Sequence, residues 1–333
     1  MTVTLRAVQR QIWAQQVLND ADFRLESASA DASFRSYWRG QSAGQTWIVM
    51  DAPPDQEDTG PWLAMAQRLT DAGLNAPLIR AVDVENGFVL MSDLGTRLFL
   101  PELNASTVDA LYGQALEALL QMQLQVPCSD LPAYDEVRLV TEMELMPTWF
   151  FERHLGFTPS CEQWDVIELA FRALISNASA QTQVFVHRDY HSRNLMITDS
   201  GKPGILDFQD AVRGPMTYDL VSLLRDCYIA WPDERVYAWV EDYRQRAEAE
   251  GLVTGTPERF RRAFDLMGLQ RHLKVLGIFC RLYYRDGKAG YLQDLPLVWR
   301  YTRDIGRRYQ ETTALIDLIE QTLGERDITL PSA

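Results

Sequence analysis

Three oxygen-bearing side chains occur at a spacing that suits phosphoryl transfer. In the segment His187-Arg188-Asp189-Tyr190-His191-Ser192-Arg193-Asn194, Asn194 follows Asp189 by five residues, and Asp207 follows Asn194 by thirteen. A carboxylate at the first position can accept the proton of an attacking hydroxyl group, while an amide oxygen and a second carboxylate hold magnesium on nucleotide phosphates. Magnesium prefers oxygen ligands and keeps several waters, so two protein ligands and phosphate oxygens suffice. The pattern predicts a catalytic base at Asp189 and metal ligands at Asn194 and Asp207.

Short apolar runs on either side of these residues predict the strands that position them. Residues 183–186 are typical of a buried strand, 195–198 of a second strand, 199–202 of a glycine-containing turn, and 205–206 of the strand that returns. We expect this arrangement to bring the three side chains to one rim. Taken singly, an Asp after a strand is usually a turn or cap residue, and an Asn in a loop usually forms an Asx-turn. The combined spacing favours a kinase-type site.

The same segments resemble a known family. The sequence HRDYHSRNLM, followed by GILDFQDAVRGPMTYDLVSLLRD, resembles the aminoglycoside phosphotransferase/choline kinase-like superfamily. It is most similar there to the bacterial kinases that phosphorylate the anomeric hydroxyl of N-acetylmuramate and N-acetylglucosamine. The resemblance extends from Ala32 to about Tyr291. His191, and the Asp-Phe-Gln-Asp sequence that begins at Asp207, argue against a protein kinase.

The resemblance implies an α+β, two-lobed protein kinase-like fold, with a small β-rich lobe over residues 1–96 and a larger helical lobe over residues 97–333. It also implies ATP and Mg²⁺ as cofactors and a small-molecule amino sugar as the binding partner. The implied reaction is phosphorylation of the C1 hydroxyl of N-acetylmuramate or N-acetylglucosamine, in peptidoglycan recycling for the cell wall. A hemiacetal hydroxyl is more acidic than an ordinary alcohol, so a carboxylate is an adequate base.

Two segments are implied to bind the nucleotide. The first is a turn rich in small residues, where backbone N–H groups can approach phosphate oxygens; its implied contacts are Ser33, Phe34 and Arg35. A plain hairpin would have a similar sequence. The second is the strand end that joins the lobes and faces adenine, with the implied contacts Met91, Ser92, Asp93 and Leu94.

The strand over residues 46–52 departs from the protein kinase pattern. Protein kinases place a phosphate-binding lysine at the end of this strand, and this chain has Met50 there. Arg35 and Arg39 are candidates for the replacement cation, although surface charge on a hairpin explains them equally well.

The acceptor side is less defined by the sequence. Residues 142–154 combine acidic and aromatic side chains, which suits a sugar, but an amphipathic helix interrupted at Pro147 explains the pattern more simply. The resemblance makes Glu144 and Trp149 possible substrate contacts. His191 and Arg193, beside the predicted base, either contact substrate or phosphate or hold the loop.

Two further features concern a long helical run and an aspartate that follows a Gly-Pro turn. Arg271 and His272 belong to a basic cluster that can receive a substrate carboxylate, such as the lactyl group of N-acetylmuramate, or can form salt bridges with neighbouring acids. For Asp219, which follows a Gly-Pro turn, the resemblance implies that its carboxylate accepts backbone N–H groups and braces the catalytic loop.

Composition limits the remaining possibilities. The chain has 333 residues, 47% of them hydrophobic and 23% charged, as in ordinary globular proteins. A net charge of −14 argues against nucleic acid or an anionic membrane as a partner. Four widely spaced cysteines without a Cys-x-x-Cys pair argue against zinc and a disulfide framework. No apolar run is long enough to span a membrane, and Arg6 and Arg10 interrupt any signal sequence, so we expect a cytoplasmic protein. No protein partner is indicated.

Helices are predicted elsewhere, and other functions stay open. Residues 5–18 predict a packing helix through Leu5, Val8, Ile12 and Leu18, and Ser160 with Gln163 predicts a capping box.

The alternative functions are a kinase of aminoglycosides, choline or homoserine, or a nucleotide-binding pseudokinase. Charge does not decide among the kinases, because the chain offers both acidic and basic groups. The complete Asp-Asn-Asp set argues against the pseudokinase.

Overall fold

The computed structural model describes residues 5–30 and 34–331, and the chain divides into two compact units. The first unit comprises Met1–Val126 and Arg193–Ala211, and the second comprises Pro127–Ser192 and Val212–Ala333. The boundary predicted at residue 96 therefore falls inside the first unit. Residues 193–211 belong to this unit because their backbone is hydrogen-bonded to it: the Ile197 N–H donates to the Arg97 carbonyl and the Ile205 N–H to the Asn75 carbonyl.

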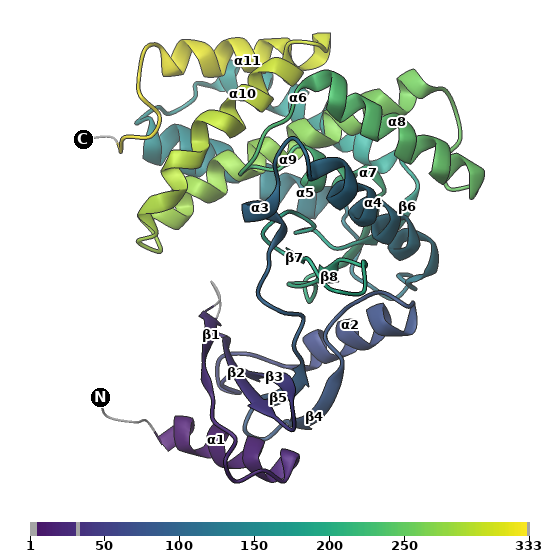
Figure 1. Ribbon diagram of the computed structural model, residues 1–333. Coiled ribbons are helices and arrows are strands. Elements are labelled where there is room, and N and C mark those ends of the chain that lie inside the picture. The colour runs from purple at the N-terminus through teal and green to yellow at the C-terminus, as the bar shows by residue number, and fades with distance from the viewer. Residues whose placement is uncertain (1–4, 31–33, 332–333) are drawn as a thin grey trace. The chain divides into compact units, whose positions relative to one another are not determined.

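An antiparallel sheet forms the main part of the first unit (Figure 1). Its strands lie in the order β1-β2-β3-β5-β4, with the bounds Glu26–Ala30 (β1), Ser36–Ser42 (β2), Gln45–Asp51 (β3), Ile79–Asp83 (β4) and Phe88–Ser92 (β5). Strands β2 and β3 form a hairpin, and β5 inserts beside β3, with Met50 opposite Val89. The strand predicted over 46–52 is confirmed, and so is the strand whose end was predicted at residues 91–94.

Helix α1 (Leu5–Leu18) packs on this sheet, but of the four predicted residues only Leu18 contributes to the contact. Leu5, Val8 and Ile12 are exposed by 76%, 41% and 46%. The helix instead buries Ala14, which contacts the core around Val49 with further packing from Trp13, Val17 and Leu18. Its orientation is fixed by charge as well as by apolar contact. Arg10 Nη1 lies 2.6 Å from Asp51 Oδ2, and Arg6 bonds to the same carboxylate. The predicted helix is therefore correct, and its predicted packing face is wrong.

The rest of the first unit consists of short helices and one small hairpin. Helix α2 (Gly60–Asp71) follows Thr59 and ends before Gly73, whose φ of +74° suits a glycine after a helix. The remaining elements are α3 (Phe99–Glu102), α4 (Val108–Gln125), β7 (Leu195–Met196) and β8 (Gly204–Ile205). Strands β7 and β8 pair antiparallel, as predicted, although β7 is shorter than the predicted strand.

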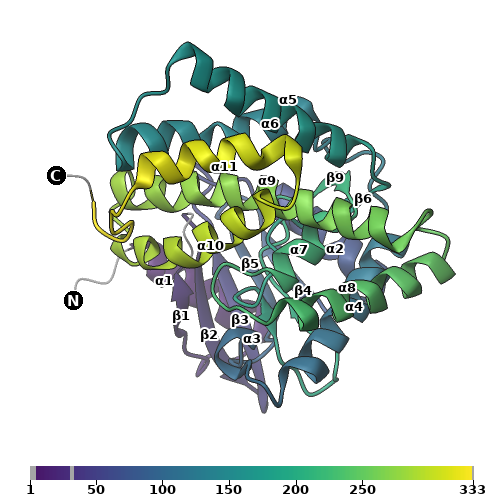
Figure 2. The same ribbon diagram turned by 90° about the horizontal axis from the view of Figure 1, so that it is seen from above.

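The second unit is mainly helical and is built around α9 (Pro257–Tyr284). This helix contacts α5, α6, α7, α8, α10 and the π-helix η1, an arrangement that Figure 2 shows from above. The other elements are α5 (Glu136–Met143), η1 (Met146–His154), α6 (Cys161–Ser179), β6 (Gln183–Val186), β9 (Val212–Pro215), α7 (Thr217–Leu224), α8 (Asp233–Ala249), η2 (Ala289–Asp294), α10 (Leu295–Gly306) and α11 (Gln310–Leu323). The predicted capping box is confirmed at the start of α6.

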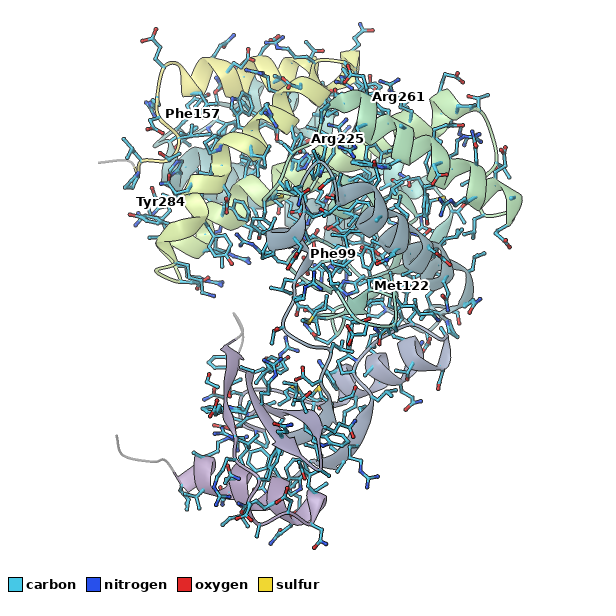
Figure 3. All side chains as sticks on the ribbon, viewed as in Figure 1. Phe99, Met122, Phe157, Arg225, Arg261 and Tyr284 are labelled. Atoms are coloured by element: carbon cyan, nitrogen blue, oxygen red, sulfur yellow. The ribbon has the colours of Figure 1, made fainter. Side chains whose placement is uncertain are left out.

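Two contacts of α9 define its surroundings. Gly277 touches the backbone of Leu145, just before η1, so closely that a Cβ atom would lie 2.2 Å from the Leu145 carbonyl carbon. Arg225, only 2% exposed, lies 3.7 Å from Asp265 of α9 and 3.2 Å from Asp233, inside the helical unit (Figure 3).

No helix in the described part of the chain is long and apolar enough to cross a membrane. All four cysteines are free thiols.

Candidate active site

The loop after β6 carries Asp189, and its backbone is hydrogen-bonded to the side chain of Asp219. The buried Asp219 carboxylate accepts the backbone N–H groups of His187 (2.6 Å) and Arg188 (2.9 Å), as predicted. Burial raises the pKa of Asp219 to about 7, and the two backbone donors oppose that rise. Arg188 adopts a φ of +78°, a conformation that non-glycine residues rarely take and that persists where surrounding contacts enforce it. The loop conformation is thus fixed by hydrogen bonds to one carboxylate.

A second carboxylate, Glu142 of α5, joins this loop to α9. Its Oε1 accepts from Arg188 Nη2 at 2.5 Å and lies 3.0 Å from Lys274 Nζ, while Oε2 accepts from the Tyr134 hydroxyl. Burial alone would raise the pKa of Glu142, but Lys274 and Arg188 bring it below the ordinary value. Glu142 is therefore an ionised group that pairs with cations from two elements. Sequence reasoning did not identify it, because nothing local marks a partner so distant in the chain.

Asp189 is half-buried in a positively charged environment. Burial would raise its pKa, but Lys274, His191, Arg271 and His187 together lower it below the usual range. The carboxylate is therefore ionised at neutral pH, as a base that accepts a hydroxyl proton must be. All of these groups belong to the second unit.

The predicted metal ligands lie together in the first unit. Asn194 Nδ2 is 3.3 Å from Asp207 Oδ2, and Asp207 has a φ of +63°, another rare conformation for a residue with a side chain. Gln209 Nε2 donates to Asp207 Oδ1 at 2.9 Å. The Oε1 atom of Gln209 is buried and has no hydrogen-bond partner in the described structure. Gln209 was missed by sequence reasoning, although its position two residues after Asp207 was a usable signal.

The donor set of this pair suits magnesium. A carboxylate, an amide that can present its oxygen, and the unpaired oxygen of Gln209 are hard oxygen ligands of the kind Mg²⁺ prefers. Across residues 5–30 and 34–331, no three His, Cys, Asp or Glu side chains gather as a separate metal site. Nucleotide oxygens and water would have to complete the coordination.

The two candidate cations for the missing lysine have different partners. Arg35, 8% exposed, places Nη2 3.7 Å from Asp207 Oδ1 and Nε 3.8 Å from Glu57. Arg39 instead binds the Asp93 carboxylate with two nitrogens, at 2.6 and 2.9 Å. Arg35 therefore lies beside the predicted metal ligand, and Arg39 supports the segment after β5. Met50 is fully buried in β3.

The side chains of the predicted nucleotide segments have mainly internal contacts. Met91 is buried, the Ser92 hydroxyl accepts the Leu78 N–H at 2.8 Å, and the Asp93 carboxylate is held by an arginine. Leu94 packs over Gly204 of β8. These side chains shape the segment after β5. In the other segment, Phe34 is 65% exposed, and Ser33 lies outside the described residues.

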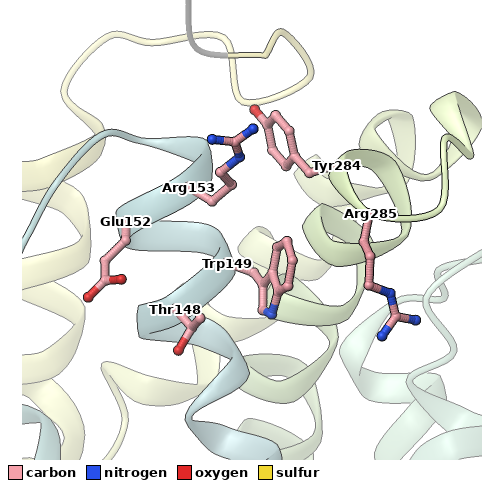
Figure 4. A pocket seen from close by; sticks show the side chains of 6 residues that line it. All are labelled: Thr148, Trp149, Glu152, Arg153, Tyr284 and Arg285. Atoms are coloured by element: carbon pink, nitrogen blue, oxygen red, sulfur yellow. The ribbon is translucent and has the colours of Figure 1, made fainter.

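Two predicted substrate contacts lie on or near η1. Glu144 is exposed at the end of α5. Trp149 is half-buried and lines a pocket of 470 Å³ between η1 and the end of α9. Figure 4 shows its lining residues: Thr148, Trp149, Glu152, Arg153, Tyr284 and Arg285. The predicted interruption at Pro147 corresponds to the start of the π-helix, a geometry frequent at functional sites.

The other predicted substrate contacts are distributed between the units. His191 lies edge-on to Tyr228, whereas Arg193 is exposed in the first unit. Arg271 is 5% exposed and donates from Nη1 to Cys227 Sγ at 3.3 Å. His272 bonds the Arg225 carbonyl and stacks on Tyr301; burial lowers its pKa to about 3, so the ring is neutral. Their contacts to a substrate remain predictions.

A β-rich unit in which Asn194 contacts Asp207 and a helical unit with a braced aspartate are typical of a phosphotransferase of the protein kinase-like class. The sequence profile of the phosphotransferase enzyme family matches residues 24–261, and the chain belongs to this family. It is 44% identical to an N-acetylmuramate/N-acetylglucosamine kinase of Pseudomonas putida, over 95% of this chain and 96% of that protein. A kinase of the same name from Neisseria meningitidis is 41% identical, over 96% and 98% of the two chains.

Solved structures show the same fold. An ethanolamine kinase of Plasmodium vivax matches with a TM-score of 0.64 at 10% identity, over 89% of this chain and 87% of that one. An ADP-bound aminoglycoside phosphotransferase, APH(2'')-Ib, matches with a TM-score of 0.59 at 16% identity, over 89% and 98%. The predicted α+β, kinase-like fold is confirmed.

Proposed function

We propose that this protein is an ATP-dependent kinase that phosphorylates the C1 hydroxyl of N-acetylmuramate and N-acetylglucosamine. The observation that carries the proposal is the complete set Asp189, Asn194 and Asp207 in a chain 41–45% identical to kinases named for these sugars. The proposed role is the recovery of cell-wall amino sugars in the cytoplasm, where ATP is available.

In the proposed reaction, Asp189 accepts the proton of the C1 hydroxyl as phosphoryl transfer proceeds. Its low pKa is sufficient, because a hemiacetal hydroxyl is more acidic than an ordinary alcohol. Asn194 and Asp207 would hold Mg²⁺, which when bound neutralises charge on the nucleotide phosphates. Arg35, beside Asp207, would supply the positive charge that the strand lysine supplies in protein kinases.

The nucleotide would bind to the first unit. We assign adenine to the backbone groups of residues 91–94, because the side chains of Ser92 and Asp93 have internal partners. Backbone N–H groups near Ser33, Phe34 and Arg35 would approach the phosphates.

The first prediction concerns the base. Asp189→Asn removes the proton acceptor while keeping the shape of the side chain, so kcat should fall by about 10²- to 10⁴-fold with ATP binding retained. Turnover is measured as ADP release with a panel of amino sugars, aminoglycosides and choline. Phosphorus NMR of the product identifies the phosphorylated hydroxyl.

Asp199→Asn, an exposed position in the turn between β7 and β8, is the control and should leave turnover unchanged. Full turnover by the Asp189→Asn variant would show that another group is the base. Turnover of choline or an aminoglycoside in place of both amino sugars would refute the sugar assignment.

A further inference from the structure

Helix α9 and the residue that follows it, Arg285, carry four cations on one face. Arg271, Lys274, Arg281 and Arg285 fall within an arc of about 80°, because successive residues of an α-helix rotate by about 100°. At about 1.5 Å per residue, the row spans about 21 Å along the helix axis. Such a row is unusual in a chain with a net charge of −14.

Two members of this row have carboxylate partners and two do not. Lys274 pairs with Glu142 at 3.0 Å, and Arg285, next to the C-terminal end of α9, pairs with Asp286 at 2.7 Å. Arg271 and Arg281 form no ion pair with any described carboxylate, and the Nε atom of each is buried without a hydrogen-bond partner. Arg271 still donates to Cys227 and is almost fully buried. Arg281 is only half-buried, so a ligand can reach it.

The surroundings of Arg281 suit a sugar. It lies on α9 one turn after Gly277, which touches the backbone of Leu145 next to η1. Three residues further, Tyr284 lines the pocket that Trp149 of η1 also lines, as Figure 4 shows. Arg281 therefore lies on α9 between Gly277, which contacts the residue before η1, and Tyr284 of the Trp149 pocket, although Arg281 does not itself line that pocket. An aromatic face packs against the C–H surface of a sugar, and a guanidinium group binds a carboxylate through two parallel hydrogen bonds.

Arg281 follows Lys274, a neighbour of the predicted base, by about two turns of α9. Lys274, whose charge lowers the pKa of Asp189, is seven residues before Arg281, or about 10 Å along the axis. The Cα–Cβ bond of Arg281 is tilted toward the N-terminal end of α9, the end on which Lys274 lies.

We propose that Arg281 binds the lactyl carboxylate of N-acetylmuramate and makes this sugar a better acceptor than N-acetylglucosamine, which lacks that group. The inference rests on the proposed function and deepens it by assigning selectivity to one residue. An unpaired guanidinium at the edge of the protein interior is only partly solvated, so an anionic ligand is bound there more strongly than at an open surface.

The test is the ratio of kcat/KM for the two sugars. Arg281→Gln should reduce kcat/KM for N-acetylmuramate by about 10- to 100-fold, the loss expected for a charge-assisted hydrogen bond, and change the value for N-acetylglucosamine by less than about 3-fold. The carboxamide of N-acetylmuramate, which is neutral at the same position, should be insensitive to the substitution. Arg281→Lys keeps the charge without the planar fork and should restore part of the ratio.

Arg262→Gln is the matched control on the same helix, because Arg262 already pairs with Glu311; both sugars should be used as by the unaltered protein. Equal losses for both sugars in Arg281→Gln, or no loss for either, would overturn the proposal and leave the kinase function intact. A selective loss in Arg271→Gln with none in Arg281→Gln would show that Arg271, and not Arg281, binds the carboxylate, and it would overturn the proposal. If the unaltered protein phosphorylates neither sugar, the proposed function itself fails.

Discussion

At the scale of single residues, the site depends on how buried charges are paired. Asp219 accepts two backbone donors, and Glu142 accepts from Arg188 while lying beside Lys274. Each buried carboxylate has partners that offset the loss of hydration, which is the condition under which buried charge is tolerated. The result is a loop whose backbone is held by a carboxylate outside it and whose local potential combines cations of α9 with histidines of the loop.

Lys274 provides a test of that potential. The carboxylate of Asp189 is held ionised by Lys274 together with Arg271 of α9 and His187 and His191 of the loop. Among these charged groups, Lys274 lowers the pKa of Asp189 the most. Lys274→Met removes its charge, so the pKa of Asp189 should rise. Because the ionised form is the base, the acidic limb of the kcat/KM profile should move to higher pH. The measurement is the pH dependence of kcat/KM.

The conservative variant separates charge from packing. Lys274→Arg keeps a cation at this position, and its acidic limb should stay close to that of the unaltered protein. A profile for Lys274→Met that is lower at every pH but not displaced would mean that Lys274 acts only by holding Glu142 in place.

At the scale of elements, local patterns predicted much of what the structure shows. Strand β6, the β7–β8 hairpin and the capping box of α6 follow from residues that are near one another in sequence. The brace from Asp219 joins residues 32 positions apart, and it was expected from the family resemblance. The packing face of α1 could not be predicted, because Arg6 and Arg10 are anchored by Asp51 on a distant strand. The pairing of Glu142 with Lys274 was missed for the same reason. Long-range charge pairs leave no local periodicity.

The contact between α9 and η1 is tested by two glycines of α9. In Gly277→Ala, the new methyl group would meet the Leu145 carbonyl carbon at 2.2 Å, so the backbone must move. Overpacking of this kind lowers the free energy of unfolding by about 1–3 kcal/mol. Because η1 carries Trp149, the KM for sugar should rise as well. Chemical denaturation and steady-state kinetics measure the two effects.

Gly268→Ala is the matched control, since its nearest neighbour, Val221 Cγ1, is 3.5 Å away and leaves room for a methyl group. Alanine stabilises a helix interior relative to glycine. The free energy of unfolding of this variant should therefore be unchanged or higher by about 0.5–1 kcal/mol. Equal stability of the two variants would show that η1 yields easily and does not depend on close contact with α9.

At the scale of the whole molecule, the predicted chemistry is divided between the two compact units. The chain leaves the second unit after Ser192 and re-enters it at Val212, so Asn194 and Asp207 belong to the first unit and Asp189 to the second. The sequence placed the three residues correctly in loops, but a single boundary near residue 96 could not describe a segment that returns to the first unit. This division allows metal binding to be tested separately from chemistry.

The last prediction uses ADP, which binds without turnover. A ligand that binds only the native state stabilises it by about 2.7 kcal/mol at 100 times its Kd. If Asp207 holds Mg²⁺ on the nucleotide, ADP with Mg²⁺ should raise the Tm of the protein by several degrees more than ADP with a chelator. In Asp207→Asn, one ligand charge is lost, and the additional Mg²⁺-dependent rise should largely disappear.

Thermal unfolding followed by fluorescence provides the measurement, with Asp199→Asn as the control for removing a carboxylate from the same segment. The control should keep the full Mg²⁺-dependent rise, because its side chain is exposed in the β7–β8 turn. A rise of equal size in Asp207→Asn would refute the metal assignment whatever the effect on turnover. Loss of the rise together with unchanged stabilisation by metal-free ADP would place the metal at Asp207, because only the Mg²⁺-dependent part of nucleotide binding would then depend on this carboxylate.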